Sequence, residues 1–280
     1  MSGPEFGIGL RGDTPRVERV ARLAEEAGFA VISVFNDLGY GEPLPPALAA
    51  ASVTERVRLG VACYNPYTLT PAEIATQFAA LDAASHGRAF VGLARGAWLD
   101  QAGVAQPHPV ATIRAAAAAI NQAIGRRVPL LIGGWGPRTV ALAGEIADEL
   151  KLGGSANPDL VPVMRERLGS ASTAIVFGAV TVVDEDGRAA RAMARERVAM
   201  YVDVIGKLDP TLRSPLDLDS DDVLDRFAFA GTPADVARQV RGLFDAGVQR
   251  VEFGVPFGLE PERGIGLLGA EVLPEFLRRR

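Results

Sequence analysis

The hydrophobic pattern of the chain alternates between two kinds of segment. Short, almost wholly apolar runs are separated by longer segments whose apolar residues recur at helical spacing. The runs predict eight buried β-strands: Glu5–Leu10, Ala30–Phe35, Arg58–Ala62, Ala89–Ala94, Pro129–Ile132, Lys151–Gly153, Thr173–Val183 and Val251–Pro256. The other segments predict helices: Thr14–Ala27, Pro45–Ser52, Thr70–Ser85, Val110–Gly125, Arg138–Glu149, 158–170, a long excursion from Arg188 to about Phe229, Ala234–Ala246 and a final piece, Gly264–Leu277.

This alternation predicts one α/β domain over residues 1–280. Strands that are apolar throughout and alternate with helices are typical of a parallel sheet covered on both faces. Eight repeats predict a single (β/α)8 TIM barrel, with the polar, proline-marked segment 207–222 as an insertion, a surface loop or lid, near the seventh helix. A doubly wound sheet is the rival, but Gly7 and Gly9 lack the third, helix-opening glycine of the dinucleotide fingerprint.

Composition and charge narrow the function classes. The chain has 48% hydrophobic residues and a net charge of -5, which argues against general nucleic-acid binding or adhesion to an acidic membrane. Its only cysteine, Cys63, can form no intrachain disulfide, so we expect a reducing compartment. The first residues lack a leader pattern, and no apolar run reaches the roughly 18 residues of a membrane span, so we expect a cytoplasmic protein.

The glycine-rich corner after the fifth strand predicts an anion site. In PLLIGGWGPRTV, Gly134, Trp135 and Gly136 follow the strand, and Pro137 opens a helix. Backbone N–H groups, the positive end of the helix dipole and the side chains of Arg138 and Thr139 converge there, as a phosphate ester would need. A tight turn whose glycines serve only the backbone is the equally weighted alternative.

The other candidate residues follow neighbouring strands, at the carboxyl ends where barrels of this kind carry their sites. They are Asp37 after strand two, Cys63, Tyr64 and Asn65 after strand three, and Arg95 and Gly96 after strand four. Asp37 is as well suited to capping a helix as to contacting a ligand, and Cys63 to packing. His86 and His108 stand in unrelated settings, so no metal site is expected. The candidate site contains few acids, bases and metal ligands, which indicates that a cofactor supplies the reactive group.

Four stretches of the chain resemble a known protein family. The likeness to the luciferase-like monooxygenase superfamily, and within it to the branch that uses the deazaflavin coenzyme F420 and includes methylenetetrahydromethanopterin reductase, spans nearly the whole chain in order. It is carried by AEEAGFAVISVFND, by TERVRLGVACYNPYTLTPAEIATQFAALDAASHGRAFVGLARG, by IGGWGPRTVALAGEIADEL and by GTPADVARQVRGLFDAGVQRVEFG with EVLPEF.

The resemblance implies a barrel with an insertion and a cofactor at its carboxyl face. It implies a non-prolyl cis peptide between Ala62 and Cys63 beneath the cofactor ring, with Cys63, Tyr64 and Asn65 in the turn beside it. It places the cofactor phosphate at the corner from Trp135 to Thr139, and Asp37 near the polar edge of the deazaflavin. It also implies a homodimer paired through helices two and three, for which Ala72–Leu81 would serve unless these residues are ordinary core.

Three departures leave the proton donor open. Where relatives carry a histidine, a glutamate and a second glutamate, this chain has Leu38, Ala97 and Gly9. Tyr64, which we take as the candidate catalytic residue with Asp37, could supply the proton, as could Tyr40, Asp100 or water.

We therefore expect an F420-dependent oxidoreductase that moves a hydride between C5 of the deazaflavin and a small organic substrate. The alternatives are an FMN-dependent monooxygenase and a non-catalytic barrel that has lost cofactor chemistry.

Overall fold

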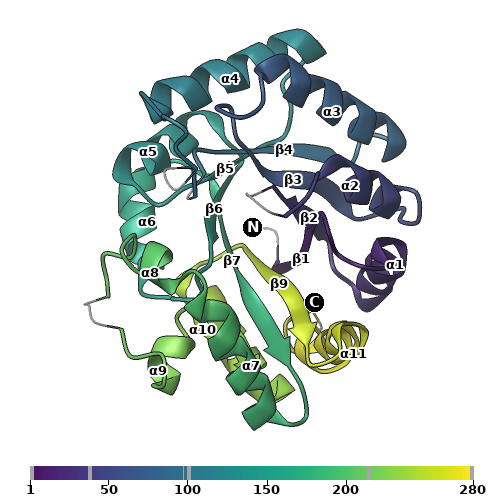
Figure 1. The fold of residues 1–280 in the computed structure, drawn as a ribbon, viewed down its shortest axis with the longest axis vertical. Helices are drawn as coiled ribbons and strands as arrows, with labels where there is room; N and C mark the ends of the chain where they lie inside the picture. Colours follow the sequence, from purple (N-terminus) through teal and green to yellow (C-terminus); the bar gives the residue numbers. More distant parts are fainter. Residues whose placement is uncertain (1–2, 37–39, 97, 100–101, 213–215, 278–280) are drawn as a thin grey trace.

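The chain forms a closed barrel of eight parallel strands, as predicted (Figure 1). The computed structural model describes residues 3–36, 40–96, 98–99, 102–212 and 216–277. Strand β9 pairs with both β1 and β7, and β6 pairs with β7, so the ring has no open edge. Its strands are β1 (Glu5–Arg11), β2 (Val31–Phe35), β3 (Arg58–Tyr64), β4 (Ala89–Ala94), β5 (Leu130–Gly133), β6 (Glu149–Gly153), β7 (Ala174–Val183) and β9 (Arg250–Gly258).

Helices surround the barrel, and the main hydrophobic core lies between the two layers. Residues of β1 that face outward, such as Phe6 and Ile8, pack there with Val20 and Ala24 of the first helix. The helices are α1 (Val17–Ala27), α2 (Leu44–Ala51), α3 (Pro71–Ala84), α4 (Pro109–Ile124), α5 (Pro137–Ile146), α6 (Leu160–Leu168), α7 (Gly187–Ala199), α8 (Val202–Ile205), α9 (Asp221–Leu224), α10 (Pro233–Ala246), α11 (Pro261–Leu267), the π-helical turn η1 (Leu268–Val272) and α12 (Pro274–Leu277). None of these helices is both long and apolar enough to cross a membrane.

The segment that follows α7 differs from the prediction. We expected helix as far as about Phe229, but Ala228–Gly231 forms a further strand, β8, which pairs with the end of β7 outside the ring. All four residues are buried. An apolar run of four residues has no periodicity that separates strand from buried helix, which explains the error.

The insertion is fixed to the loop that follows β6. The buried amide of Asn157 donates to the Asp209 carboxylate and to the Thr211 hydroxyl, each at 2.8 Å. Arg226, which lies beyond α9, donates to the Asn157 side-chain oxygen at 2.7 Å. The described part of 207–222 is therefore held against the barrel on the side of α6 and α10 (Figure 1).

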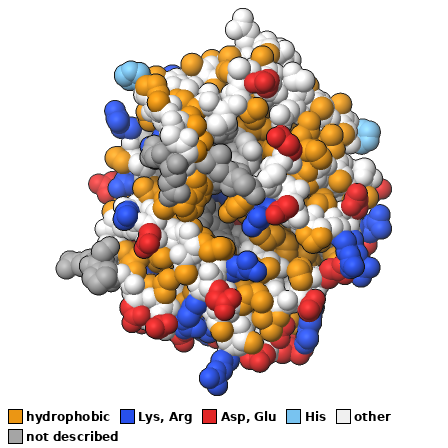
Figure 2. Space-filling model, in the orientation of Figure 1, with side chains coloured by type: hydrophobic (Ala, Val, Ile, Leu, Met, Phe, Trp, Pro, Cys, Tyr) orange, Lys and Arg blue, Asp and Glu red, His pale blue; other side chains and the backbone are white. Residues whose placement is uncertain are grey.

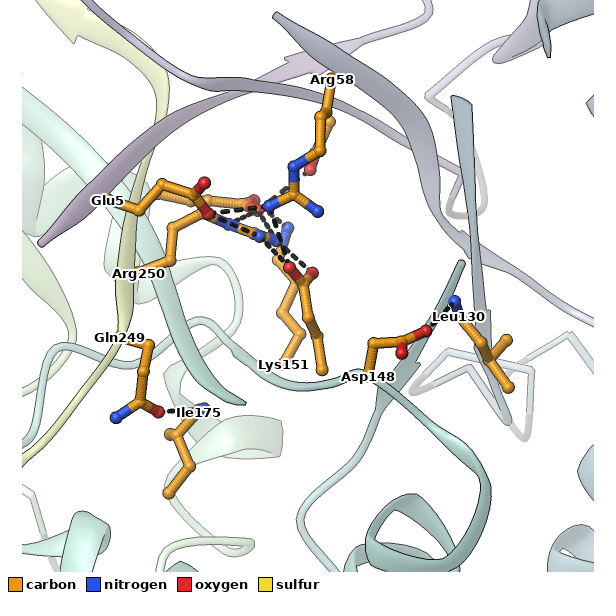
Figure 3. A network of polar contacts seen from close by, with 11 residues as sticks. Glu5, Arg58, Leu130, Asp148, Lys151, Ile175, Gln249 and Arg250 are labelled. Atoms are coloured by element: carbon orange, nitrogen blue, oxygen red, sulfur yellow. Dashed lines mark hydrogen bonds and ion pairs between the residues drawn. The ribbon is translucent and has the colours of Figure 1, made fainter. Parts of the chain in front are cut away.

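The inside of the barrel is charged, contrary to our expectation of strands that are apolar throughout. Charged residues occupy alternate positions of β6 and β9, and their side chains meet in the interior (Figure 3). Arg250 binds the Glu149 carboxylate with two nitrogens, and one of the same nitrogens lies 2.9 Å from Glu252. Lys151 pairs with the other oxygen of Glu252, and Ser33 donates to this carboxylate at 3.1 Å.

The network is balanced in charge. Glu5 and Arg58 complete it at the amino end of the barrel, where Arg58 lies 2.8 Å from Glu5 and 3.0 Å from Glu149. Three carboxylates therefore face three cations. Burial alone would raise the pKa of Glu252, but Lys151 and Arg250 outweigh it and lower that pKa. The carboxylate stays charged because its partners replace the lost water.

Replacing Arg250 with methionine should destabilise the fold strongly. The side chain is 1% exposed, so its loss leaves two buried carboxylates short of a partner. Breaking a buried ion pair on one side costs about 3–5 kcal/mol, and we expect that loss in the free energy of unfolding measured with urea. Arg263→Gln removes an exposed pair with Glu185 and should change it by less than about 1 kcal/mol. Equal stabilities for both variants would contradict this account.

Candidate functional site

The peptide bond between Ala62 and Cys63 is cis, as the resemblance implied. It lies near the end of β3, where the register with β4 shifts. The Cys63 side chain points into the barrel, in a small interior cluster with Ala62, Phe90 and Leu131. A methyl group on Gly92 or Gly133 would lie 3.2 Å or 2.9 Å from the Cys63 sulfur. Glycine on β4 therefore lets the thiol of β3 reach the end of β5.

The corner after β5 has the features of an anion site. The N-cap of α5, Gly136, has no side-chain cap, and none of the described residues places a side-chain acceptor on the first N–H groups of the helix. A methyl group on Gly136 would meet no atom within 4 Å, so the backbone is open on that side. Gly134 is needed for packing, because a methyl group there would lie 2.6 Å from Thr139. The corner is thus open at its N-terminal turn and closely packed behind it.

Trp135 and Arg138 lie on opposite sides of this corner. The Trp135 side chain is 7% exposed and belongs to the main core between barrel and helices, while its carbonyl accepts from Arg167 at 2.7 Å. Arg138 is exposed and makes no ion pair or hydrogen bond with any residue that the structure describes. Its guanidinium is free to bind an anion at the helix terminus, and the indole belongs to the core. These residues fit a phosphate ester.

Asn65 joins the loops after β3 and β4. Its buried side chain donates to the carbonyl of Arg95 at 2.5 Å and accepts from the N–H of Tyr67 at 2.9 Å. Gly96 lies against this amide with φ +86, where a methyl group would be 2.4 Å from the Asn65 nitrogen. Asn65 and Gly96 therefore position the exposed Arg95 at the barrel mouth.

The two candidate catalytic residues fare differently. Asp37 lies outside the described residues, as do Leu38, Ala97 and Asp100, so nothing is added to their predicted roles. Tyr64 is only 1% exposed and packs in the main core, whereas its neighbour Cys63 faces the barrel interior. The Tyr64 hydroxyl is buried and has no hydrogen-bond partner among the described residues. The structure therefore separates Tyr64 from the mouth because consecutive strand residues face opposite sides.

The sequence prediction missed Arg11 and Tyr201 among the polar residues around the mouth. The Arg11 guanidinium lies 4.4 Å from the centre of the Tyr40 ring and pairs with Asp13. Tyr201, between α7 and α8, donates to the carbonyl of Phe227 at 2.9 Å, and burial raises the pKa of its phenol. Tyr201 lies between α7 and α8 rather than at a strand end, so reading the strand ends could not have found it.

The molecular surface is hollowed on one face. The hollow lies near the centre of the face in Figure 2, and hydrophobic, basic and acidic side chains lie around it. Among the described residues, no group of three or more His, Cys, Asp or Glu is placed to hold a metal ion. The expectation of no metal site therefore stays a prediction.

Comparison with known proteins places the chain in a family. A family model described as luciferase-like monooxygenase matches residues 6–250. The 5,10-methylenetetrahydromethanopterin reductase of Methanolobus tindarius is 25% identical over 96% of this chain and 99% of its own length.

Solved structures share the fold. The coenzyme F420-dependent tetrahydromethanopterin reductase of Methanopyrus kandleri has a TM-score of 0.81 at 22% identity, over 98% of this chain and all of that one. The oxygenating constituent of 3,6-diketocamphane monooxygenase from Pseudomonas putida, in complex with FMN, has a TM-score of 0.72 at 15% identity, over 99% of both chains. Since the family model covers most of the sequence, this chain belongs to the luciferase-like monooxygenase family.

Proposed function

We propose that the protein is an F420-dependent oxidoreductase that moves a hydride between C5 of the deazaflavin and a small organic substrate. The observation that carries the proposal is the corner after β5, where an uncapped helix terminus and the free Arg138 lie beside the strand end contacted by Cys63. The similarity to F420-dependent and methanopterin reductases supports the same cofactor.

The residues of this chain would bind and orient the cofactor rather than perform its chemistry. Arg138, Thr139 and the N–H groups of α5 would hold the phosphate, and the strand end at Ala62 and Cys63 would support the ring. When bound, F420 supplies a carbon that accepts or releases hydride. Asn65 and Gly96 would keep the loops of the mouth in place, and Asp37 would lie near the polar edge of the ring.

FMN is the second candidate cofactor because it also ends in a phosphate that the same corner would bind. The FMN complex of a protein with this fold supports that alternative. It would make the chain a monooxygenase supplied with reduced FMN. A barrel without cofactor chemistry would bind neither compound.

The assembly and location of the protein remain proposals. We propose a cytoplasmic protein that forms a homodimer. Sedimentation of the purified protein would test the dimer. The predicted pairing segment gives it little support, since Ile74, Ala75, Phe78 and Leu81 are all buried in the core of their own chain. Any pairing through α3 would have to use its exposed alanines instead.

Binding of F420 and FMN, followed by fluorescence, tests the proposed function. We expect F420 to bind and Arg138→Ala to weaken its binding by roughly 10- to 100-fold, the effect of losing a charge-assisted hydrogen bond. Arg241→Ala, which changes an exposed arginine on α10, is the matched control and should leave binding unchanged. Tight FMN binding without F420 binding would favour the monooxygenase, and binding of neither would favour the non-catalytic barrel.

Tyr64→Phe tests whether Tyr64 supplies a proton. Burial raises the pKa of its phenol, and the hydroxyl has no partner to lose. We expect unchanged F420 affinity and an unfolding free energy that is unchanged or higher by about 1 kcal/mol. Tyr67→Phe is the control, since its hydroxyl donates to the Pro107 carbonyl at 2.8 Å and should cost about 1 kcal/mol. Loss of cofactor reduction in Tyr64→Phe alone would restore Tyr64 as a catalytic residue.

A further inference from the structure

The ring of Phe35 reaches into the barrel interior from the carboxyl end of β2. A methyl group on Gly9 of β1 would lie 2.1 Å from the tip of this ring, so the ring fills the space of a side chain at position 9. On the opposite side of the barrel, the Lys151 ammonium of β6 lies 4.9 Å from the ring centre. Phe35 therefore spans the interior from β1 to β6.

Lys151 lies just beneath the mouth and is hidden from it. It stands two residues before the end of β6, and its side chain is 5% exposed. Its ammonium is bound by Glu252 and faces the ring of Phe35, which is itself only partly buried. The Phe35 ring therefore faces the mouth, and the Lys151 ammonium lies behind it.

This arrangement bears on the charge of any ligand. An anion gains from a buried ammonium only if it comes within a few ångströms of it in a medium of low dielectric. The described neighbours of the Phe35 ring include Gly9, whose missing side chain the ring replaces, and the Lys151 ammonium. The ring therefore covers the ammonium that Glu252 also binds.

We propose that Phe35 is a specificity-determining residue, which shields Lys151 so that the deep end of the mouth takes an uncharged part of the substrate. Removing the ring would uncover the Lys151 ammonium, so that a ligand carboxylate would share this cation with Glu252. The inference rests on the proposed function only in assigning the substrate to the mouth. A purely structural role for Phe35 would change stability without changing the charge preference for ligands.

The test compares two probes of similar size, cyclohexanol and cyclohexanecarboxylate, by calorimetric titration of the full-length protein without cofactor. We expect Phe35→Ala to bind the carboxylate roughly tenfold or more tightly than the wild type does, the gain of one charge-assisted contact. Phe35→Leu, which keeps an apolar cover, should show a smaller gain. Phe35→Val replaces Phe35→Ala if the latter does not unfold cooperatively.

A second comparison assigns the gain to Lys151. Lys151→Met and Glu252→Gln, made together so that neither charge is left buried alone, should abolish the gain when added to Phe35→Ala. Cyclohexanol binding should not respond to this exchange. An unchanged carboxylate affinity in Phe35→Ala, or a gain that survives the exchange, would overturn the proposal. These titrations need no cofactor. A failure of F420 to bind would therefore contradict the proposed function without changing the test of whether Phe35 covers Lys151.

Discussion

The structure depends on the bidentate pair between Arg250 and Glu149 inside the barrel. The Arg250 side chain is 1% exposed and that of Glu149 is 11% exposed, so each charge is tolerated largely because the other, with Glu252 and Lys151, replaces the lost hydration. The pair joins β9 to β6, which are not neighbours in the ring, and thereby ties together strands that do not hydrogen-bond to each other. A barrel interior filled with apolar side chains would gain more free energy from burial. Paired charges, however, are compatible with few alternative packings of the interior.

Much of the fold could be predicted from the hydrophobic pattern, because it reports which faces the helices cover. All eight barrel strands are found near their predicted positions. The pattern failed where the chemistry of the interior differs from that of the outer core. Strand β6 was predicted to begin at Lys151 because Glu149 looked like the end of a helix, although Glu149, Lys151, Arg250 and Glu252 alternate with apolar residues. Reading that alternation as a charged interior would have extended the strand correctly.

The candidate site was predictable to the extent that it depends on backbone. Glycines and a proline at a strand-to-helix corner are visible in any sequence. Gly136 has open space where a side chain would be, and the anion site at this corner stays a prediction. Side-chain direction was not predictable at Tyr64, since one residue along a strand reverses the face. The contact between Phe35 and Gly9 was not predictable either. The two residues are far apart in sequence, and no local pattern encodes that the ring of one fills the space beside the other.

The position of the Cys63 sulfur has a consequence for how such a barrel can change over time. The thiol occupies volume over Gly92 and Gly133, so three strands share one small space. A larger side chain at any of the three positions requires a smaller one at another. Whether a substitution at one position is tolerated therefore depends on the residues at the other two. Sequence diversification at the base of the mouth should therefore proceed by correlated exchanges rather than by independent single steps.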